Sequence, residues 1–402
     1  MPTQTSHTAR PRLHHGLHPG FLVLVSASLL SLVLGSVHAF SVFLEPLEAR
    51  FGASRSLVSL TYSLNLVSLT LAVLAGHRVF SRWPPGPLVA AIGLIAATGT
   101  LIAAYAPSLP MLWFGYSLLF GAANGLGYGF GLQIAAQANP GREGICMGIV
   151  TACYALGAAV SPALFTWAMS LGGFLAAMLG LSATLIIVAP IAAGLMIKAK
   201  ARFNVSTDDG PRPPTPTRQI ALLWLGYGAG VAAGLMAIGH AAGIAKSLGI
   251  GGAPWVAPVL IAICNMAGSL CAGWLVDRLS AAKLLAGLPV ISAAALLLLA
   301  FASNSAVALL CLGSVGFAYG AIIAAYPATI AKMFGSNAST RIYGRVFTAW
   351  GSAGLFAPWL AGYLFDQTGG YIVALGTAAA LGVVSAGAMV VLFRCEYERA
   401  EG

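Results

Sequence analysis

Apolar residues in this chain form long uninterrupted blocks, and short polar segments separate one block from the next. About 20 apolar residues in a helix cross the hydrocarbon core of a bilayer. A membrane β-barrel would instead show short segments in which polar and apolar residues alternate. The pattern therefore predicts an all-α membrane protein with twelve transmembrane helices. The spans are expected near residues 20–44, 57–76, 87–105, 110–136, 145–170, 174–197, 219–245, 254–276, 283–303, 306–332, 343–365 and 372–394.

The longest polar segment between spans, residues 198–218, is rich in Pro, Gly and charge. Such a composition is typical of a flexible linker. It separates six predicted spans from six others. The expected organisation is a cytoplasmic N-terminal tail (1–19), a six-helix bundle (20–197), a cytoplasmic linker (198–218), a second six-helix bundle (219–395) and a cytoplasmic tail (396–402).

Charged residues are scarce and their positions are informative. Only 7% of the residues are Asp, Glu, Lys or Arg, against about 25% in a soluble domain. This composition excludes a soluble enzyme, a disordered chain and a nucleic-acid-binding protein, despite the net charge of +10. All ten acidic residues lie at the edges of the predicted spans or outside them, which argues against a carboxylate proton relay and against a deep site for organic cations.

The basic residues predict the orientation, because Lys and Arg accumulate in cytoplasmic loops. With the N-terminus inside, 17 of the 20 Lys and Arg residues fall inside, and Arg50, Arg55 and Lys246 fall outside. The expected location is the cell inner membrane, crossed many times, with both termini in the cytoplasm. We expect a monomer in the lipid bilayer, with no cofactor and no metal site. The N-terminal tail contains four histidines: His7, His14, His15 and His18. It is interpreted as a solvated tail, and weak metal binding is the alternative.

The two halves of the chain repeat one another. At a constant offset of 196, Gly148, Tyr154, Pro162 and Gly173 match Gly344, Trp350, Pro358 and Gly369. His38 in the first span has a counterpart at His240 in the seventh. Several matches in parallel orientation favour duplicated, pseudo-symmetric six-helix halves.

The segment 273–278, GWLVDR, resembles the G-x-L-x-D-R signature of the major facilitator superfamily. The resemblance covers residues 20–395 and implies two six-helix bundles that alternate access to a central site. It also implies a conformational latch made by Asp277 and Arg278, with Arg78 in the degenerate first-half copy. The alternative for these charges is that they only set the topology.

A narrower resemblance lies in residues 326–371, including the segment DQTGGY at 366–371. It is similar to the oxalate/formate antiporter and monocarboxylate transporter group, which implies transport of small carboxylates. The chain departs from that group where substrate charge is expected. Ser269 stands near the position of a cationic residue, Asn265 stands where an acid often lies, and no Lys follows Trp350.

Apart from Tyr and Cys, and from Lys and Arg at the span ends, His38 and His240 are the only ionisable side chains inside the predicted spans. An ionisable group inside a membrane is a candidate functional residue, and histidine takes and releases protons near neutral pH. We expect the pair to face the cavity and to bind substrate or couple protons, unless each His only bonds a neighbouring carbonyl or Ser. Aromatic, amide and hydroxyl side chains are expected to complete the substrate site: Tyr62, Asn124, Tyr128, Tyr154, Asn265, Ser269, Tyr326 and Trp350.

These observations predict a secondary transporter, with no enzymatic activity, for a small organic anion such as a monocarboxylate, with a proton as the candidate coupling ion. Two alternatives remain open: an exporter of hydrophobic compounds, and a sensor or scaffold on the same fold that does not transport. A membrane enzyme is disfavoured because the spans contain none of the paired acids or Ser/His clusters that such catalysis needs.

Overall fold

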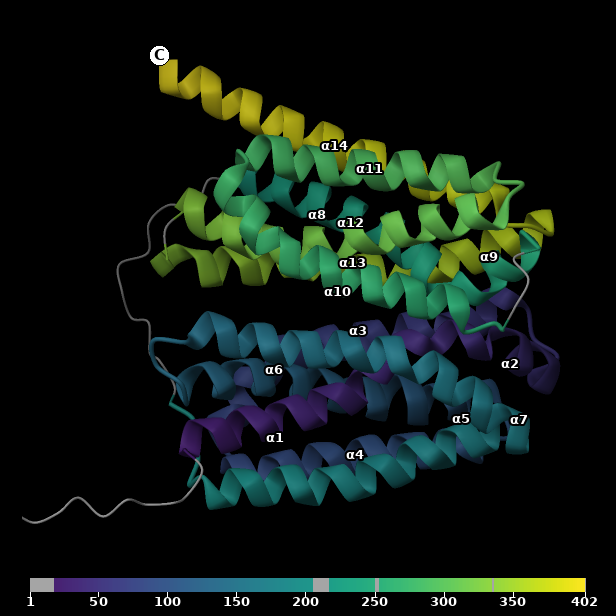
Figure 1. Ribbon diagram of the computed structural model, residues 1–402, viewed down its shortest axis with the longest axis vertical. Coiled ribbons are helices and arrows are strands. Elements are labelled where there is room, and N and C mark those ends of the chain that lie inside the picture. Colours follow the sequence, from purple (N-terminus) through teal and green to yellow (C-terminus); the bar gives the residue numbers. More distant parts are fainter. Residues whose placement is uncertain (1–17, 205–216, 250–252, 335, 402) are drawn as a thin grey trace, which may run out of the picture.

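The computed structural model describes residues 18–204, 217–249, 253–334 and 336–401, without the side chains of His77, Gly273, Asp277, 336–341 and 395–401. Over this part of the chain the structure is helical, with turns and no strands. Figure 1 shows two bundles of helices that lie one above the other. The lower bundle contains α1 (Pro19–Leu34), η1 (Gly35–Phe43), α2 (Leu44–Phe51), α3 (Arg55–Phe80), α4 (Pro85–Ala104), α5 (Leu109–Leu112), η2 (Trp113–Phe120), α6 (Gly121–Gln137) and α7 (Glu143–Lys198). The upper bundle contains α8 (Thr217–Gly239), α9 (Ala241–Ser247), α10 (Val256–Arg278), α11 (Ala281–Ala300), α12 (Ser305–Phe334), α13 (Ser336–Thr368) and α14 (Ile372–Glu401).

The helices reproduce the twelve predicted spans. Within the described residues, nine helical stretches are long and apolar enough to cross a membrane. One of them, α7, contains the two spans predicted at 145–170 and 174–197. The spans predicted at 110–136 and 343–365 correspond to the run α5–η2–α6 and to α13. The break inside α7 falls at Gly172 and Gly173, and Gly173 has a φ of 65°, which favours a residue without a Cβ.

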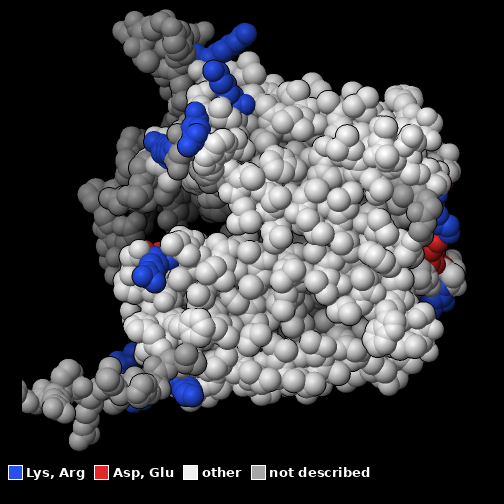
Figure 2. All heavy atoms as spheres, viewed as in Figure 1, with Lys and Arg blue, Asp and Glu red and all other residues white. Residues whose placement is uncertain are grey.

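The long helices run from one end of the molecule to the other. We call these ends the linker end, where α7 ends and α8 begins, and the far end, where α2 and α9 lie (Figure 1). On the face shown in Figure 2, charged side chains gather at these two ends, and the surface between them is almost free of charge. This distribution is what a protein embedded in hydrocarbon requires.

The sequence pattern had suggested that the first and seventh spans are continuous α-helices, but the structure shows that they are not. The first continues from α1 into η1, a 3₁₀-helix, and the seventh is interrupted at His240 between α8 and α9. Hydrophobic periodicity does not reveal either change, because both segments remain apolar. A 3₁₀-helix has three residues per turn, so side chains three positions apart lie in line along η1.

Glycines hold η1 against α7. A Cβ atom at Gly35 would lie 1.9 Å from the carbonyl oxygen of Tyr154, and one at Gly157 would lie 1.9 Å from that of Leu32. The two backbones therefore touch, which is how helices with small residues pack in membranes. This crossing fixes where η1 presents His38 relative to Tyr154 on α7.

Candidate functional site

A small cavity of about 20 Å³ lies between the two bundles. Its lining comes from both: His38, Ala158, Ile238, Ala241, Pro258, Ile261, Ala262, Asn265 and Tyr319. A volume of this size holds about one water molecule. The bundles thus close tightly around the cavity in this conformation.

His38 forms the polar part of the wall contributed by the N-terminal bundle. Its Nδ1 lies 2.7 Å from the Tyr62 hydroxyl, and its ring meets the Tyr154 ring edge-on at 5.6 Å between centroids. Tyr154 donates a hydrogen bond of 3.1 Å to Oδ1 of the buried Asn124, whose Nδ2 donates to the carbonyl of Leu34. Side chains from η1, α3, α6 and α7 are thereby joined, and the ring of His38 is held in one orientation.

Asn265 and Tyr319 form the polar part of the opposite wall. Trp350 donates its Nε1–H to the Tyr319 hydroxyl at 3.2 Å, so Trp350 positions a cavity residue. Ser269 lies about one helical turn from Asn265 and donates to the carbonyl of Gly320 at 3.1 Å.

Of the other predicted residues, Tyr128 lies behind the N-terminal wall of the cavity, and Tyr326 lies in the C-terminal bundle. The Tyr128 hydroxyl bonds Thr151 at 3.3 Å, and its ring packs on Tyr154 with centroids 4.6 Å apart. Tyr326 is fully buried and its hydroxyl contacts the Met389 sulfur, on α14. The structure therefore places Tyr326 in the interior of the C-terminal bundle, although its sequence position suggested a substrate contact.

His240 lies in a different environment from His38. It is fully buried and does not line the cavity, contrary to the expectation that both histidines face it. Its Nε2 lies 2.8 Å from the carbonyl of Pro358, and its Nδ1 lies 3.2 Å from the Tyr371 hydroxyl. A carbonyl can only accept, so Nε2 carries the proton and Nδ1 accepts from Tyr371. His240 thus connects the junction of α8 and α9 to Pro358 in α13 and to Tyr371, which precedes α14.

Arg55 connects His240 and Tyr371 to the N-terminal bundle. The Arg55 guanidinium donates to the Tyr371 hydroxyl at 2.8 Å and makes two hydrogen bonds to the Glu48 carboxylate. It also lies over the ring of Phe365, 4.1 Å from its centroid. His240 reaches across as well, 3.2 Å from the Ser59 hydroxyl.

Asp366 caps a helix of the other bundle. Its carboxylate accepts from the backbone N–H groups of Arg55 at 3.0 Å and Ser56 at 2.9 Å, which open α3. Carboxylates at a helix N-terminus stabilise the unpaired N–H groups and the helix dipole. Together with the ion pair from Lys246 to Glu45 at 2.6 Å, these contacts form the far-end interface: Glu45, Glu48, Arg55, Ser59, His240, Lys246, Asp366 and Tyr371.

Sequence reasoning had missed this interface. Arg55 and Lys246 were interpreted as the few outer loop charges, and Asp366 as a residue outside the span. The segment 366–371 stood out as a motif, but the sequence did not indicate which residues it contacts.

The latch predicted at the linker end remains a prediction. Arg278 lies over the ring of Trp274 in the same helix, 4.6 Å from its centroid, and Arg78 is exposed. The side chain of Asp277 lies outside the described residues, as do His7, His14 and His15 and most of the linker. No group of three or more His, Cys, Asp or Glu side chains suited to a metal occurs in the described part.

Comparison with known families decides the classification. The family model described as Major Facilitator Superfamily matches residues 23–358 and 230–402. The chain belongs to the major facilitator superfamily. It is therefore a multi-pass membrane protein on a transporter fold, and the superfamily works by secondary transport with alternating access to small solutes.

Relatives within the superfamily agree with the narrower resemblance. The uncharacterized MFS-type transporter YhjX of Escherichia coli K12 is 26% identical over 343 residues, covering 82% of this chain and 85% of its own. Monocarboxylate transporter 13 of Rattus norvegicus is 26% identical and covers 93% of this chain and 89% of its own. The oxalate:formate antiporter of Oxalobacter formigenes is 24% identical and covers 84% and 82%.

Solved structures confirm the fold. A bacterial homologue of the human lysosomal transporter Spinster, in an inward-facing and occupied conformation, superimposes with a TM-score of 0.74 at 14% identity over 94% of this chain and 98% of its own. The D-xylose-proton symporter gives a TM-score of 0.73 at 15% identity over 92% and 97%.

Proposed function

We propose that this superfamily member transports a small monocarboxylate and that His38 is the residue that binds its charge. The observation that supports this most directly is the position of His38 at the cavity between the bundles, with only its Nδ1 engaged, by Tyr62. None of the hydrogen bonds among the described residues reaches its Nε2.

The chemistry of His38 suits a carboxylate. A protonated imidazole offers two N–H donors and a positive charge. Tyr62 takes one donor, and the carboxylate of a solute takes the other. This arrangement compensates for the missing cation near Ser269, because the charge comes from the opposite bundle. A proton bound by His38 would travel with the anion, which gives symport, or stay behind during exchange of one anion for another.

The relatives named monocarboxylate transporter 13 and oxalate:formate antiporter support this substrate class. We further propose that the linker end faces the cytoplasm of an inner membrane, in agreement with its Lys and Arg residues. The far-end interface closes one side of the molecule, and Figure 2 shows a hollow between the bundles at the linker end. The conformation is then inward-facing.

Counterflow in proteoliposomes tests the proposal. Vesicles loaded with unlabelled formate, lactate or hexanoate should accumulate the labelled anion when they contain wild-type protein. The His38→Ala variant should lose this accumulation by at least about tenfold, the equivalent of one lost charge-assisted hydrogen bond. His18→Ala is the matched control, because His18 lies at the start of α1 and bonds only a backbone N–H of its own helix.

The outcome also separates the alternatives. Equal exchange by His38→Ala and wild type would contradict the role of His38. Exchange of hydrophobic compounds without carboxylates would favour an exporter, and an absence of exchange with every solute would favour a sensor or scaffold.

A further inference from the structure

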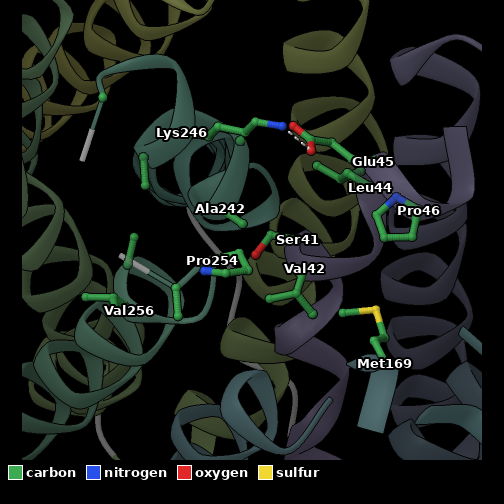
Figure 3. A pocket seen from close by; sticks show the side chains of 15 residues that line it. Ser41, Val42, Leu44, Glu45, Pro46, Met169, Ala242, Lys246, Pro254 and Val256 are labelled. Carbon is green, nitrogen blue, oxygen red and sulfur yellow. Dashed lines mark hydrogen bonds and ion pairs between the residues drawn. The ribbon is translucent and has the colours of Figure 1, made fainter. Parts of the chain in front are cut away.

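A second and larger pocket opens at the far end, between η1 and α2 of one bundle and α9 and α10 of the other (Figure 3). Its volume is about 500 Å³, within the range of small-molecule sites in proteins. The walls are largely apolar, with Val42 and Pro46 on one side and Pro254 and Val256 on the other.

Ser41 is the buried polar group of this pocket. It is only 2% exposed, and its hydroxyl has no hydrogen-bond partner among the described residues. Buried hydroxyls nearly always have a partner in folded proteins. Figure 3 shows the Ser41 side chain directed from η1 toward Pro254, across the pocket. The missing partner is therefore expected to be a bound molecule.

Lys246 and Glu45 form the rim. Their ion pair of 2.6 Å joins the two bundles, and the side chains are 72% and 44% exposed. An ion pair in such contact with water contributes little stability. Another carboxylate can thus replace Glu45 as the partner of Lys246 with little change in free energy.

The register of η1 links this pocket to the cavity. Ser41 and His38 are three residues apart in a 3₁₀-helix, so they lie on one face, about 6 Å apart along the axis. On the opposite side, Ala242 and Ala257 line the pocket, while their chain neighbours Ala241 and Pro258 line the cavity. The pocket lies directly on the far-end side of the cavity.

We propose that this pocket is an entry site for the transported carboxylate, and this inference rests on the proposed function. The anion replaces Glu45 on Lys246 and bonds the Ser41 hydroxyl, while the apolar walls take its hydrocarbon part. Because the Glu45–Lys246 pair is one of the contacts that join the bundles, its replacement removes that contact from the far-end interface. Separation of the bundles then lets the anion move one 3₁₀ turn to His38.

Cysteine protection tests the site with hexanoate as the probe. The Ser41→Cys variant, in detergent, is modified with anionic methanethiosulfonate ethylsulfonate, and wild-type protein gives the background from the native cysteines. Hexanoate at nine times its dissociation constant should slow the modification about tenfold, because only the unoccupied fraction reacts. Neutral hexanamide and cationic hexylammonium should leave the rate unchanged.

The charge of Lys246 and the hydroxyl of Ser41 are tested separately. Lys246→Gln on the Ser41→Cys background should abolish protection, whereas Lys283→Gln, a lysine at the linker end, should retain it. Ala242→Cys places the thiol on the opposite wall and keeps Ser41. Adding Ser41→Ala to that variant should weaken protection several-fold, and this pair also replaces the first assay if Ser41→Cys does not fold.

Equal protection by hexanamide, or protection that survives Lys246→Gln, overturns the entry site. If wild-type protein exchanges hexanoate in a His38-dependent manner and neither thiol is protected, the entry site fails and the proposed function stands. If the protein exchanges no carboxylate, the proposed function fails whatever the labelling shows.

Discussion

The far-end interface and the central cavity use the same kinds of side chain in opposite ways. At the far end, His240 has partners on both ring nitrogens, and Arg55 bonds Glu48 and Tyr371 while lying over Phe365. At the cavity, His38 has a partner on one nitrogen only among the residues that the structure describes. A polar group whose capacity is used within the protein holds the structure together, and one with spare capacity can bind a solute. Sequence symmetry pairs these histidines, but the structure places them in different surroundings.

Removal of Arg55 should have the largest effect on stability. Its side chain is nearly buried, and Arg55→Ala leaves the Glu48 carboxylate and the Tyr371 hydroxyl without their donor. We expect a loss of about 3 kcal/mol, as for a buried ion pair that loses one partner. Thermal unfolding in detergent measures this loss. Arg50→Ala is the control, because Arg50 bonds backbone carbonyls within its own bundle; equal losses for both variants would show that Arg55 has no special role.

Replacement of His240 should lower stability by about 2 kcal/mol, because His240→Ala removes one hydrogen-bond partner each from the buried Tyr371 and Ser59 hydroxyls and from the Pro358 carbonyl. His38→Ala should lose transport, with a stability loss of about 1 kcal/mol from the hydrogen bond to Tyr62. Unfolding and counterflow measured on both variants reveal the difference. The reverse pattern, a stable His240→Ala without transport, would mean that His240 and not His38 serves the solute.

The hydrogen bond between the Tyr62 hydroxyl and His38 can be tested by itself. Tyr62→Phe keeps the ring and removes only the 2.7 Å hydrogen bond to His38. A stability loss of about 1 kcal/mol is expected, together with a lower maximal exchange rate, because the imidazole then has no fixed orientation. Tyr116→Phe is the control, since Tyr116 is equally buried and packs on Phe40 without contacting His38. An unchanged exchange rate in Tyr62→Phe would show that the orientation of His38 does not matter.

The smallest effect is expected for the exposed ion pair. Glu45→Gln removes one partner of Lys246, and both side chains contact water. The stability loss should stay below about 1 kcal/mol and disappear at high salt. Thermal unfolding at low and high salt checks this. A loss comparable to that of Arg55→Ala would place the main closure of the far end at Glu45 instead.

Much of the architecture could be predicted because the bilayer imposes it. Long apolar blocks must become helices in hydrocarbon, since every backbone polar group needs a partner there. The break at Gly172 and Gly173 follows from a residue type that interrupts helices. His38, Asn265 and Tyr154 were expected near the site, because buried polar residues in a membrane face the interior.

Other features depend on contacts between distant parts of the chain. Asp366 caps α3 from the opposite bundle, and nothing near it in the sequence identifies that partner. Tyr326 and Trp350 looked equivalent as aromatic candidates, yet one contacts Met389 in a bundle interior and the other positions Tyr319 at the cavity.

By itself, the sequence determined the class of protein, the number of spans, the repeat of the halves and the short list of polar residues inside them, because the apolar solvent constrains each helix separately. The tertiary structure alone decided which of these residues keep a free hydrogen-bonding atom. That depends on how η1 winds and crosses α7, and on which groups meet when the two bundles close. The difference between His38 and His240 is the result.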